Sequence, residues 1–178
     1  MSAPMSARAT ARATVRTRRL DQAVGQAMSA LSAAAKKGLG DPALAELVVI
    51  RASQLNHCAF CLDMHLTLAR EHGVGERQLG LLAAWEEAEG VFDERERAAL
   101  ALTEAVTVLA GGTSQVSGSG AGSGSGSGRG CVPDDVYDRA AAHFDASELA
   151  HLTGLIVAIN NWNRVMVARR VPPGGHTP

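Results

Sequence analysis

The chain has 178 residues, of which 46% are hydrophobic, and its formal net charge at pH 7 is −1. This size and composition suit one domain with a real core, and the near-neutral charge excludes an electrostatic drive toward nucleic acid or anionic membranes. No run of roughly eighteen apolar residues occurs, so the sequence predicts no membrane span.

The amino-acid usage favours an all-α protein. Aromatic residues make up only 3% of the chain, and its apolar residues are mainly alanine, leucine and valine. Such side chains suit closely packed helices better than a sandwich of sheets. The first nineteen residues carry five arginines and no acidic residue. We interpret this segment (1–19) as a disordered basic tail rather than as a transit peptide.

Three helices are predicted after the tail. Residues 20–38 repeat apolar side chains at helical spacing, with Gly38 as the expected stop. The residues of this apolar face are Leu20, Val24, Met28 and Leu31. The second helix starts at Asp41, which can accept from free backbone amides, and Pro42 suits its first turn. The third covers about residues 58–71.

Four more helices follow, which makes about seven in all. Residues 75–88 form a short fourth helix and 92–112 a fifth, in which Asp93 and Glu96 have the spacing of a capping box. The sixth begins after Pro133.

Two segments in the C-terminal half of the chain are predicted to be unstructured. Residues 113–130 are rich in glycine and serine, lack an apolar face, and are expected to form a flexible insertion within one domain. The seventh helix, "SELAHLTGLIVAINNWNRVMVARR", is capped by Ser147 or Asp145, and residues 172–178 form a disordered tail.

The strongest functional signal is "NHCAFCLDMH", residues 56–65. Cys58, Cys61 and His65 are spaced by three and four residues, so on a helix they share one face and can touch. Free amides at the helix start favour a thiolate there, and a nearby imidazole can take or hold the proton. A second thiol can then convert a sulfenic acid into a disulfide. The pattern therefore indicates a redox dithiol.

Glu46 is a candidate fourth member of this site. It lies twelve residues before Cys58 on the preceding helix, and its apolar neighbours would raise the pKa of its carboxyl group. Antiparallel packing of the two helices could place Glu46 where it orients His65 or relays a proton. The alternative, an ordinary ion pair with Arg51 or Lys37, is equally consistent with the sequence.

These residues carry a family resemblance. The run "ELVVIRASQLNHCAFCLDMHLTLAREHGV" resembles the core signature of the AhpD-like alkyl hydroperoxidases, within the carboxymuconolactone decarboxylase superfamily. Glu46, Cys58, Cys61 and His65 match the four functional positions at the family's spacing. The later run "LTGLIVAINNWNRVMVA" resembles the closing helix of that family, so the resemblance defines an AhpD-like domain over residues 20–171.

The resemblance implies an enzyme that reduces hydroperoxides through a dithiol–disulfide cycle. It implies that Cys61 is the cysteine that reacts with the peroxide, that Cys58 resolves the product, and that Glu46 and His65 relay protons. The residues alone leave the order of the thiols open, because Cys58 is nearer the helix start while Cys61 lies one turn from His65.

The expected partners follow from the same chemistry. They are a hydroperoxide substrate, an external dithiol reductant for which a lipoyl protein is the family-based candidate, and further copies of the chain in a trimer or hexamer. No bound organic cofactor or metal is required, and neither nucleic acid nor membrane is expected. The chain has three cysteines, and the two in the motif are too close in sequence to join distant parts of a secreted fold, which favours the cytoplasm.

Three other readings remain. Cys58, Cys61 and His65 could bind zinc together with Glu46 or Cys131, although no second CxxC or HxxxH pair is present. The dithiol could instead serve a non-catalytic redox-sensing or interaction module. The superfamily's lactone decarboxylase chemistry would not need the thiols at all. We expect Cys131 to be a spectator and the "NNWNR" stretch to pack between subunits.

Overall fold

The computed structural model describes residues 20–109 and 132–174. The predicted basic tail, the glycine- and serine-rich insertion, Cys131 and residues 175–178 lie outside these ranges. Within them the ordered elements are helices without strands, which confirms the all-α prediction. The elements are α1 (Gln22–Leu39), α2 (Pro42–Leu55), α3 (Ala59–Glu71), α4 (Glu76–Leu81), a 3₁₀ turn η1 (Leu82–Ala84), α5 (Glu94–Thr107), α6 (Asp134–His143) and α7 (Ala146–Arg169).

Aspartates cap helices α2, α5 and α7. The Asp41 side chain accepts from the Leu44 amide at 3.0 Å, which starts α2 as predicted. Asp93 forms the predicted capping box with Glu96 at the start of α5. Of the two caps considered for α7, Asp145 holds the position, and it forms a second capping box. Each such cap satisfies backbone amides that the first helical turn leaves free.

Three predicted boundaries were wrong. The fifth helix, predicted to run to residue 112, ends at Thr107. Gly38 does not end α1, which continues to Leu39 and stops at Gly40, a residue with φ of 69°. Gly38 instead allows a close approach, because a Cβ at this position would lie 2.0 Å from a ring carbon of His151 on α7. The fourth helix is also shorter than expected, since α4 tightens into a 3₁₀ turn after Leu81.

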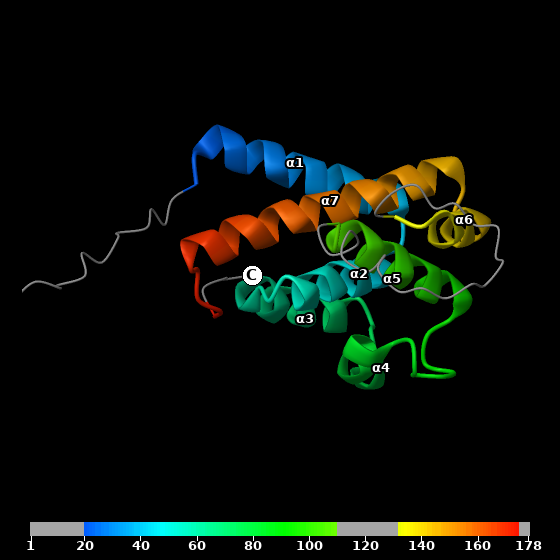
Figure 1. Cartoon of the computed structure of the whole chain (residues 1–178). Coiled ribbons are helices and arrows are strands. Elements are labelled where there is room, and N and C mark those ends of the chain that lie inside the picture. Colours follow the sequence, from blue (N-terminus) through cyan, green and yellow to red (C-terminus); the bar gives the residue numbers. More distant parts are fainter. Residues whose placement is uncertain (1–19, 110–131, 175–178) are drawn as a thin grey trace, which may run out of the picture.

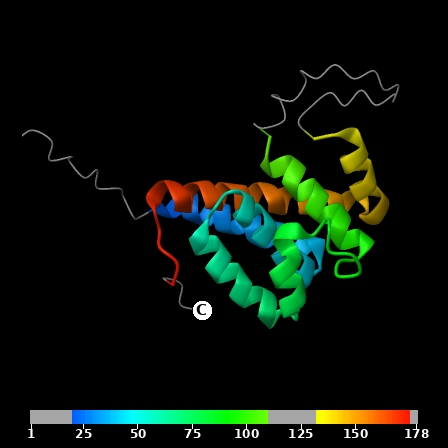
Figure 2. The same cartoon turned by 60° about the horizontal axis from the view of Figure 1, so that its bottom comes forward.

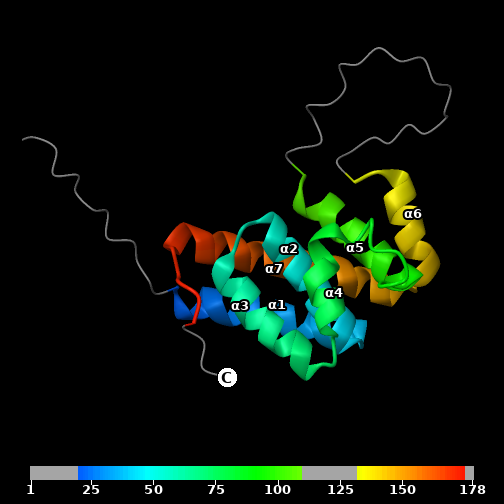
Figure 3. The ribbon, with the colours of Figure 1, turned by 90° about the horizontal axis from the view of Figure 1, so that it is seen from below.

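Helix α2 is the centre of the fold. Its residues from Leu44 to Ile50 are all buried, because α2 packs against α3, α5 and α7. Helices α1 and α7 run side by side in opposite directions along one edge of the molecule (Figure 1). In the view from below, α3 and α4 lie in front of this pair (Figure 3). Both cysteines of the motif belong to the core cluster between α2 and α7.

The predicted apolar face of α1 is only partly used within the subunit. Ala35 and Leu39 are buried, but Val24 is 48% exposed and Leu31 is 40% exposed. Two valines of the neighbouring α7, Val157 and Val167, are similarly exposed. Apolar surface therefore remains on the pair formed by α1 and α7.

After α7 the chain turns back toward α3 (Figure 2). Arg170 adopts a left-handed conformation that ends the helix. The Gly174 amide then donates to a carboxylate oxygen of Asp63 at 2.8 Å. Among the described residues, no helix combines the length and the apolar character needed to cross a membrane.

Candidate active site

A tight turn between α2 and α3 delivers the two cysteines to the core. Asn56 ends α2, and His57 then takes a positive φ of 53°, which is uncommon for a residue with a side chain. The Cys58 amide donates back to the Ser53 carbonyl at 3.0 Å. This reversal makes Cys58 the N-cap of α3 and puts Cys61 in its first turn.

The cysteine sulfurs lie 2.7 Å apart, and both residues are only 1% exposed. Either thiol could donate across this distance, so the surroundings decide where the negative charge rests. A hydrogen bond from Cys61, together with the backbone amides of Cys61 and Phe60, lowers the pKa of Cys58 to about 6 although burial opposes it. The same hydrogen bond raises the pKa of Cys61, and burial adds to the increase. These opposite directions favour the negative charge on Cys58 and the proton on Cys61.

Glu46 is drawn into the site by two partners. It is 1% exposed, and its two carboxylate oxygens accept separately from Lys36 Nζ and from His65 Nδ1, the latter at 2.7 Å. The expectation that burial would raise its pKa was wrong. Burial does act in that direction, but hydrogen bonds and positive charge from His65 and Lys36 outweigh it, so the pKa of Glu46 is lowered.

The alternative ion pairs proposed for Glu46 do not form. Arg51 pairs with Glu104 at 2.7 Å, and the lysine that reaches Glu46 is Lys36 rather than the exposed Lys37. The structure thus brings Glu46 and His65 together, and it adds Lys36, which the sequence analysis missed.

The hydrogen bond to Glu46 fixes the orientation of His65. A carboxylate can only accept, so His65 Nδ1 must carry a hydrogen, and Nε2 is the nitrogen that can take up or release a proton. His65 is 6% exposed and lies one turn after Cys61 on the same helix. This arrangement can move protons to and from groups that enter beside Cys61.

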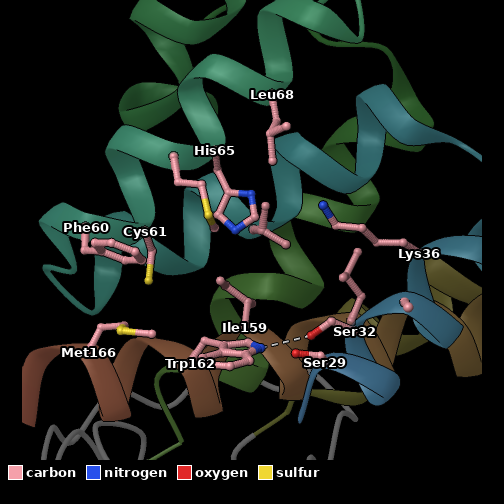
Figure 4. Close-up of a pocket in the computed structure, with 14 residues that line it drawn as sticks. Ser29, Ser32, Lys36, Phe60, Cys61, His65, Leu68, Ile159, Trp162 and Met166 are labelled. Carbon is pink, nitrogen blue, oxygen red and sulfur yellow. Dashed lines mark hydrogen bonds between the residues drawn. The ribbon is translucent and has the colours of Figure 1, made fainter. Parts of the chain in front are cut away.

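A pocket of about 460 Å³ opens onto Cys61, and Cys58 does not line it. In Figure 4, Cys61, His65 and Lys36 all point into this space. Helices α1 and α7 form the facing wall, where the Trp162 indole donates to the Ser32 hydroxyl at 3.1 Å. Most of the remaining lining is apolar, and it consists of Ala33, Val49, Phe60, Met64, Leu68, Leu155, Ile159 and Met166.

Asn163 of α7 is a second site residue that the sequence analysis missed. It is fully buried, it donates to the Ser53 hydroxyl at 3.0 Å, and its side chain lowers the pKa of both Cys58 and Cys61. The "NNWNR" stretch was expected to pack between subunits, and this stays a prediction. Within the subunit, Asn160 and Asn163 are buried and Trp162 lines the pocket. The sequence did contain a signal that could have identified Asn163, namely two asparagines three residues apart on an otherwise apolar helix.

The described residues contain no group of three or more histidine, cysteine, aspartate or glutamate side chains that could hold a metal ion. The candidate ligands are paired instead, sulfur with sulfur and His65 with Glu46. Cys131, considered as a further zinc ligand, lies outside the described ranges.

Lys36→Met is expected to lower the free energy of unfolding at neutral pH by about 2 kcal/mol, because it removes a cation beside a buried carboxylate. This figure is smaller than for a fully buried ion pair, because water screens a lysine side chain that is one-third exposed. The folded pKa of Glu46 lies below its ordinary value, so its stabilisation is present above that value and is lost as the pH falls through the folded pKa. Loss of Lys36 raises this pKa. The difference between variant and wild type should therefore shrink toward about pH 4.

Denaturant titrations between about pH 4 and pH 8 measure this difference. Lys37→Met is the matched control, since Lys37 is exposed on the same helix and should leave stability unchanged. A difference that is constant with pH would show that Lys36 does not act through the charge of Glu46.

Comparison with known proteins places the same residues inside a family match. The sequence model of the carboxymuconolactone decarboxylase family matches residues 8–105, which include all four residues predicted for the site. The uncharacterised protein YdfG of Bacillus subtilis is 36% identical over 123 residues, which cover 69% of this chain and 71% of YdfG. The uncharacterised protein YnjA of Escherichia coli is 30% identical over 135 residues, 76% of this chain and 63% of YnjA.

A solved structure shows a similar fold. The crystal structure of ATU0492 from Agrobacterium tumefaciens, a protein of unknown function and candidate antioxidant defence protein AhpD, has a TM-score of 0.71 at 31% identity. The match covers 86% of this chain and 92% of that one.

Proposed function

We propose that this chain, which belongs to the carboxymuconolactone decarboxylase family and is AhpD-like, is a thiol-dependent peroxidase that acts on organic hydroperoxides. One observation carries the proposal. A buried sulfur pair, 2.7 Å apart, lies at an apolar pocket into which the ion-paired His65 also points. This combination supplies a nucleophile, a resolving thiol and a group that moves protons.

The proposed cycle balances in three steps. A thiolate attacks the distal oxygen of the hydroperoxide, the O–O bond breaks, and the products are a cysteine sulfenic acid and an alkoxide that becomes an alcohol by taking a proton. The second thiolate attacks the sulfenic sulfur, releasing hydroxide, which is protonated to water, and forming the Cys58–Cys61 disulfide. An external dithiol then reduces this disulfide and is itself oxidised.

We assign the first attack to Cys61 and the second to Cys58. The lowered pKa belongs to Cys58, but Cys61 is the cysteine of the pair that lines the pocket. Transfer of the Cys61 proton to the adjacent Cys58 sulfur would place the thiolate where a hydroperoxide can reach it. His65, held in place by the Glu46 carboxylate, would then pass a proton to the leaving alkoxide.

The lining of the pocket favours substrates with an apolar group beside the peroxide. Apart from Cys61, His65, Lys36 and two serines, the walls are apolar. The reductant is proposed to be a dithiol, such as a lipoyl group, that enters the same opening. Exposed apolar residues on α1 and α7 are consistent with a homo-oligomer. A dithiol cycle also suits a reducing compartment such as the cytoplasm.

The test is to mix the reduced protein with an organic hydroperoxide and excess dithiol and to count turnovers, free thiols and bound metal. We expect many turnovers, and the loss of two thiols per equivalent of peroxide when the dithiol is withheld. A single turnover would indicate a redox sensor instead. Lactone decarboxylation that survives alkylation of both thiols, or a stoichiometric metal that blocks alkylation, would contradict the proposal.

A further inference from the structure

Lys36 places a positive charge on the wall of the pocket. The residue belongs to α1, its side chain is 33% exposed, and in Figure 4 its ammonium group points into the pocket. Among the described residues that line this space, none is acidic. A small molecule in the pocket therefore meets a cation without an anion on the same surface.

Glu46 does not cancel this charge on the pocket side. Its carboxylate accepts from Lys36 Nζ, but Glu46 is 1% exposed and does not line the pocket. The ion pair is thus oriented, with its positive end at the pocket and its negative end in the core. An ammonium group has three N–H donors, and Glu46 is the one acceptor that Lys36 Nζ has among the described residues. Two donors therefore remain for a ligand.

The pocket has a polar end on α1 and a reactive end at Cys61. In Figure 4, Lys36 and Cys61 lie on opposite sides of His65. Ser29 also lines the pocket, and it shares a face of α1 with Lys36 because seven residues make nearly two helical turns. The remaining lining is mainly apolar. A ligand that matches this space carries a hydrogen-bond acceptor at one end and an apolar chain beside the cysteine.

We propose that Lys36 binds a carboxylate and that the pocket takes amphipathic acids, with the acid group at Lys36 and the apolar chain extending past His65 toward Cys61. A charge-assisted hydrogen bond fixes one end of such a ligand, and burial of its chain adds affinity. Binding requires only the pocket. That the natural ligands are hydroperoxides of carboxylic acids rests on the proposed peroxidase function. Lys36 is then the residue that selects substrates by their charge.

Binding of unreactive molecules to the reduced wild-type protein tests the proposal. Decanoate and methyl decanoate share a chain and differ in charge. The fluorescence of Trp162, which lines the pocket, reports the binding of both, while Trp85 lies in a separate core cluster. We expect decanoate to bind about tenfold more tightly, and this preference to shrink as salt is added. A purely hydrophobic pocket would prefer the more apolar ester, so equal affinities or tighter binding of the ester would overturn the proposal.

Three variants locate the preference. Lys36→Met should abolish the advantage of decanoate, whereas Lys36→Arg should keep it because the charge remains. Lys37→Met is the matched control, since Lys37 is exposed on the same helix and does not line the pocket. Comparing two ligands on each variant cancels any change in stability, because the folded fraction is common to both. A folded Lys36→Met protein that still prefers decanoate would refute the assignment.

Turnover separates this inference from the proposed function. The hydroperoxide of a fatty acid should be reduced with a KM about tenfold lower than the KM of its methyl ester and with a similar kcat, because Lys36 contacts the substrate away from the peroxide. A preference for decanoate in a protein that reduces neither compound would support carboxylate binding and reject the peroxidase proposal. Reduction of both compounds with equal KM would support the peroxidase and reject the carboxylate site.

Discussion

Cys61→Ser is expected to lower the rate of hydroperoxide reduction by ~10³-fold or more, because a serine hydroxyl cannot replace a thiolate as nucleophile at neutral pH. Cys61 is the cysteine that lines the pocket, so no other sulfur of the pair meets the substrate there. The variant should remain folded, since serine differs from cysteine by a single atom in a core that already contains hydrogen-bonding groups. Steady-state turnover with excess dithiol measures the effect.

Cys58→Ser should behave differently. Its remaining Cys61 should be oxidised once by hydroperoxide and stop as a sulfenic acid, because the resolving thiol is gone. Trapping with a sulfenic-acid reagent and mass spectrometry would identify the oxidised residue. A sulfenic acid on Cys58 in the Cys61→Ser protein would reverse the assigned order of the thiols, and a wild-type turnover rate in that protein would end the mechanism. Cys131→Ser is the control, with an unchanged rate expected.

The parts of this site that the sequence predicted are local in the chain. Cys58, Cys61 and His65 lie within one helix and its cap, where the helical period decides which side chains share a face. Glu46 could be added because a short turn joins its helix to theirs. The helix caps at Asp41 and Asp93 could also be predicted from the sequence, since capping depends on a few neighbouring residues.

The parts that the sequence missed depend on contacts between distant segments. Lys36 reaches Glu46 from α1, and Asn163 reaches Ser53 beside the cysteine turn from α7, and no local pattern records either contact. The direction of the Glu46 pKa was misjudged for the same reason. Apolar neighbours in sequence implied an increase, but Lys36 and His65, brought in by packing, reverse it.

The end of α1 shows the same limit. Two glycines lie close together there, and sequence alone favoured the first as the stop. Gly38 is required by the close approach of His151, a residue 113 positions later, whereas Gly40 supplies the left-handed cap. Local propensity could not separate a glycine that ends a helix from one that admits a neighbouring helix.

Glu46→Gln is expected to slow hydroperoxide reduction by about 10²-fold over the whole range from pH 5 to pH 9 without unfolding the protein. The carboxylate serves two donors, Lys36 Nζ and His65 Nδ1, with separate oxygens. A carboxamide has only one acceptor oxygen. If that oxygen faces Lys36, the amide nitrogen faces His65 and forces Nδ1 to accept, which moves the hydrogen to Nε2 and removes the base. If that oxygen faces His65, the amide nitrogen faces Lys36 Nζ, and two hydrogen-bond donors then oppose each other.

The breadth of the pH range follows from the lowered pKa of Glu46. The group is already ionised above its ordinary pKa, so the wild type has no titration of Glu46 near neutral pH for the variant to lose. Glu104→Gln is the matched control, because Glu104 also accepts from two donors, Arg51 at 2.7 Å and Trp85 at 2.6 Å, away from the cysteines. It should cost stability but leave the turnover rate unchanged. Equal rates for Glu46→Gln and the wild type at every pH would remove Glu46 from the proton relay, and the buried ion pair with Lys36 would then be structural alone.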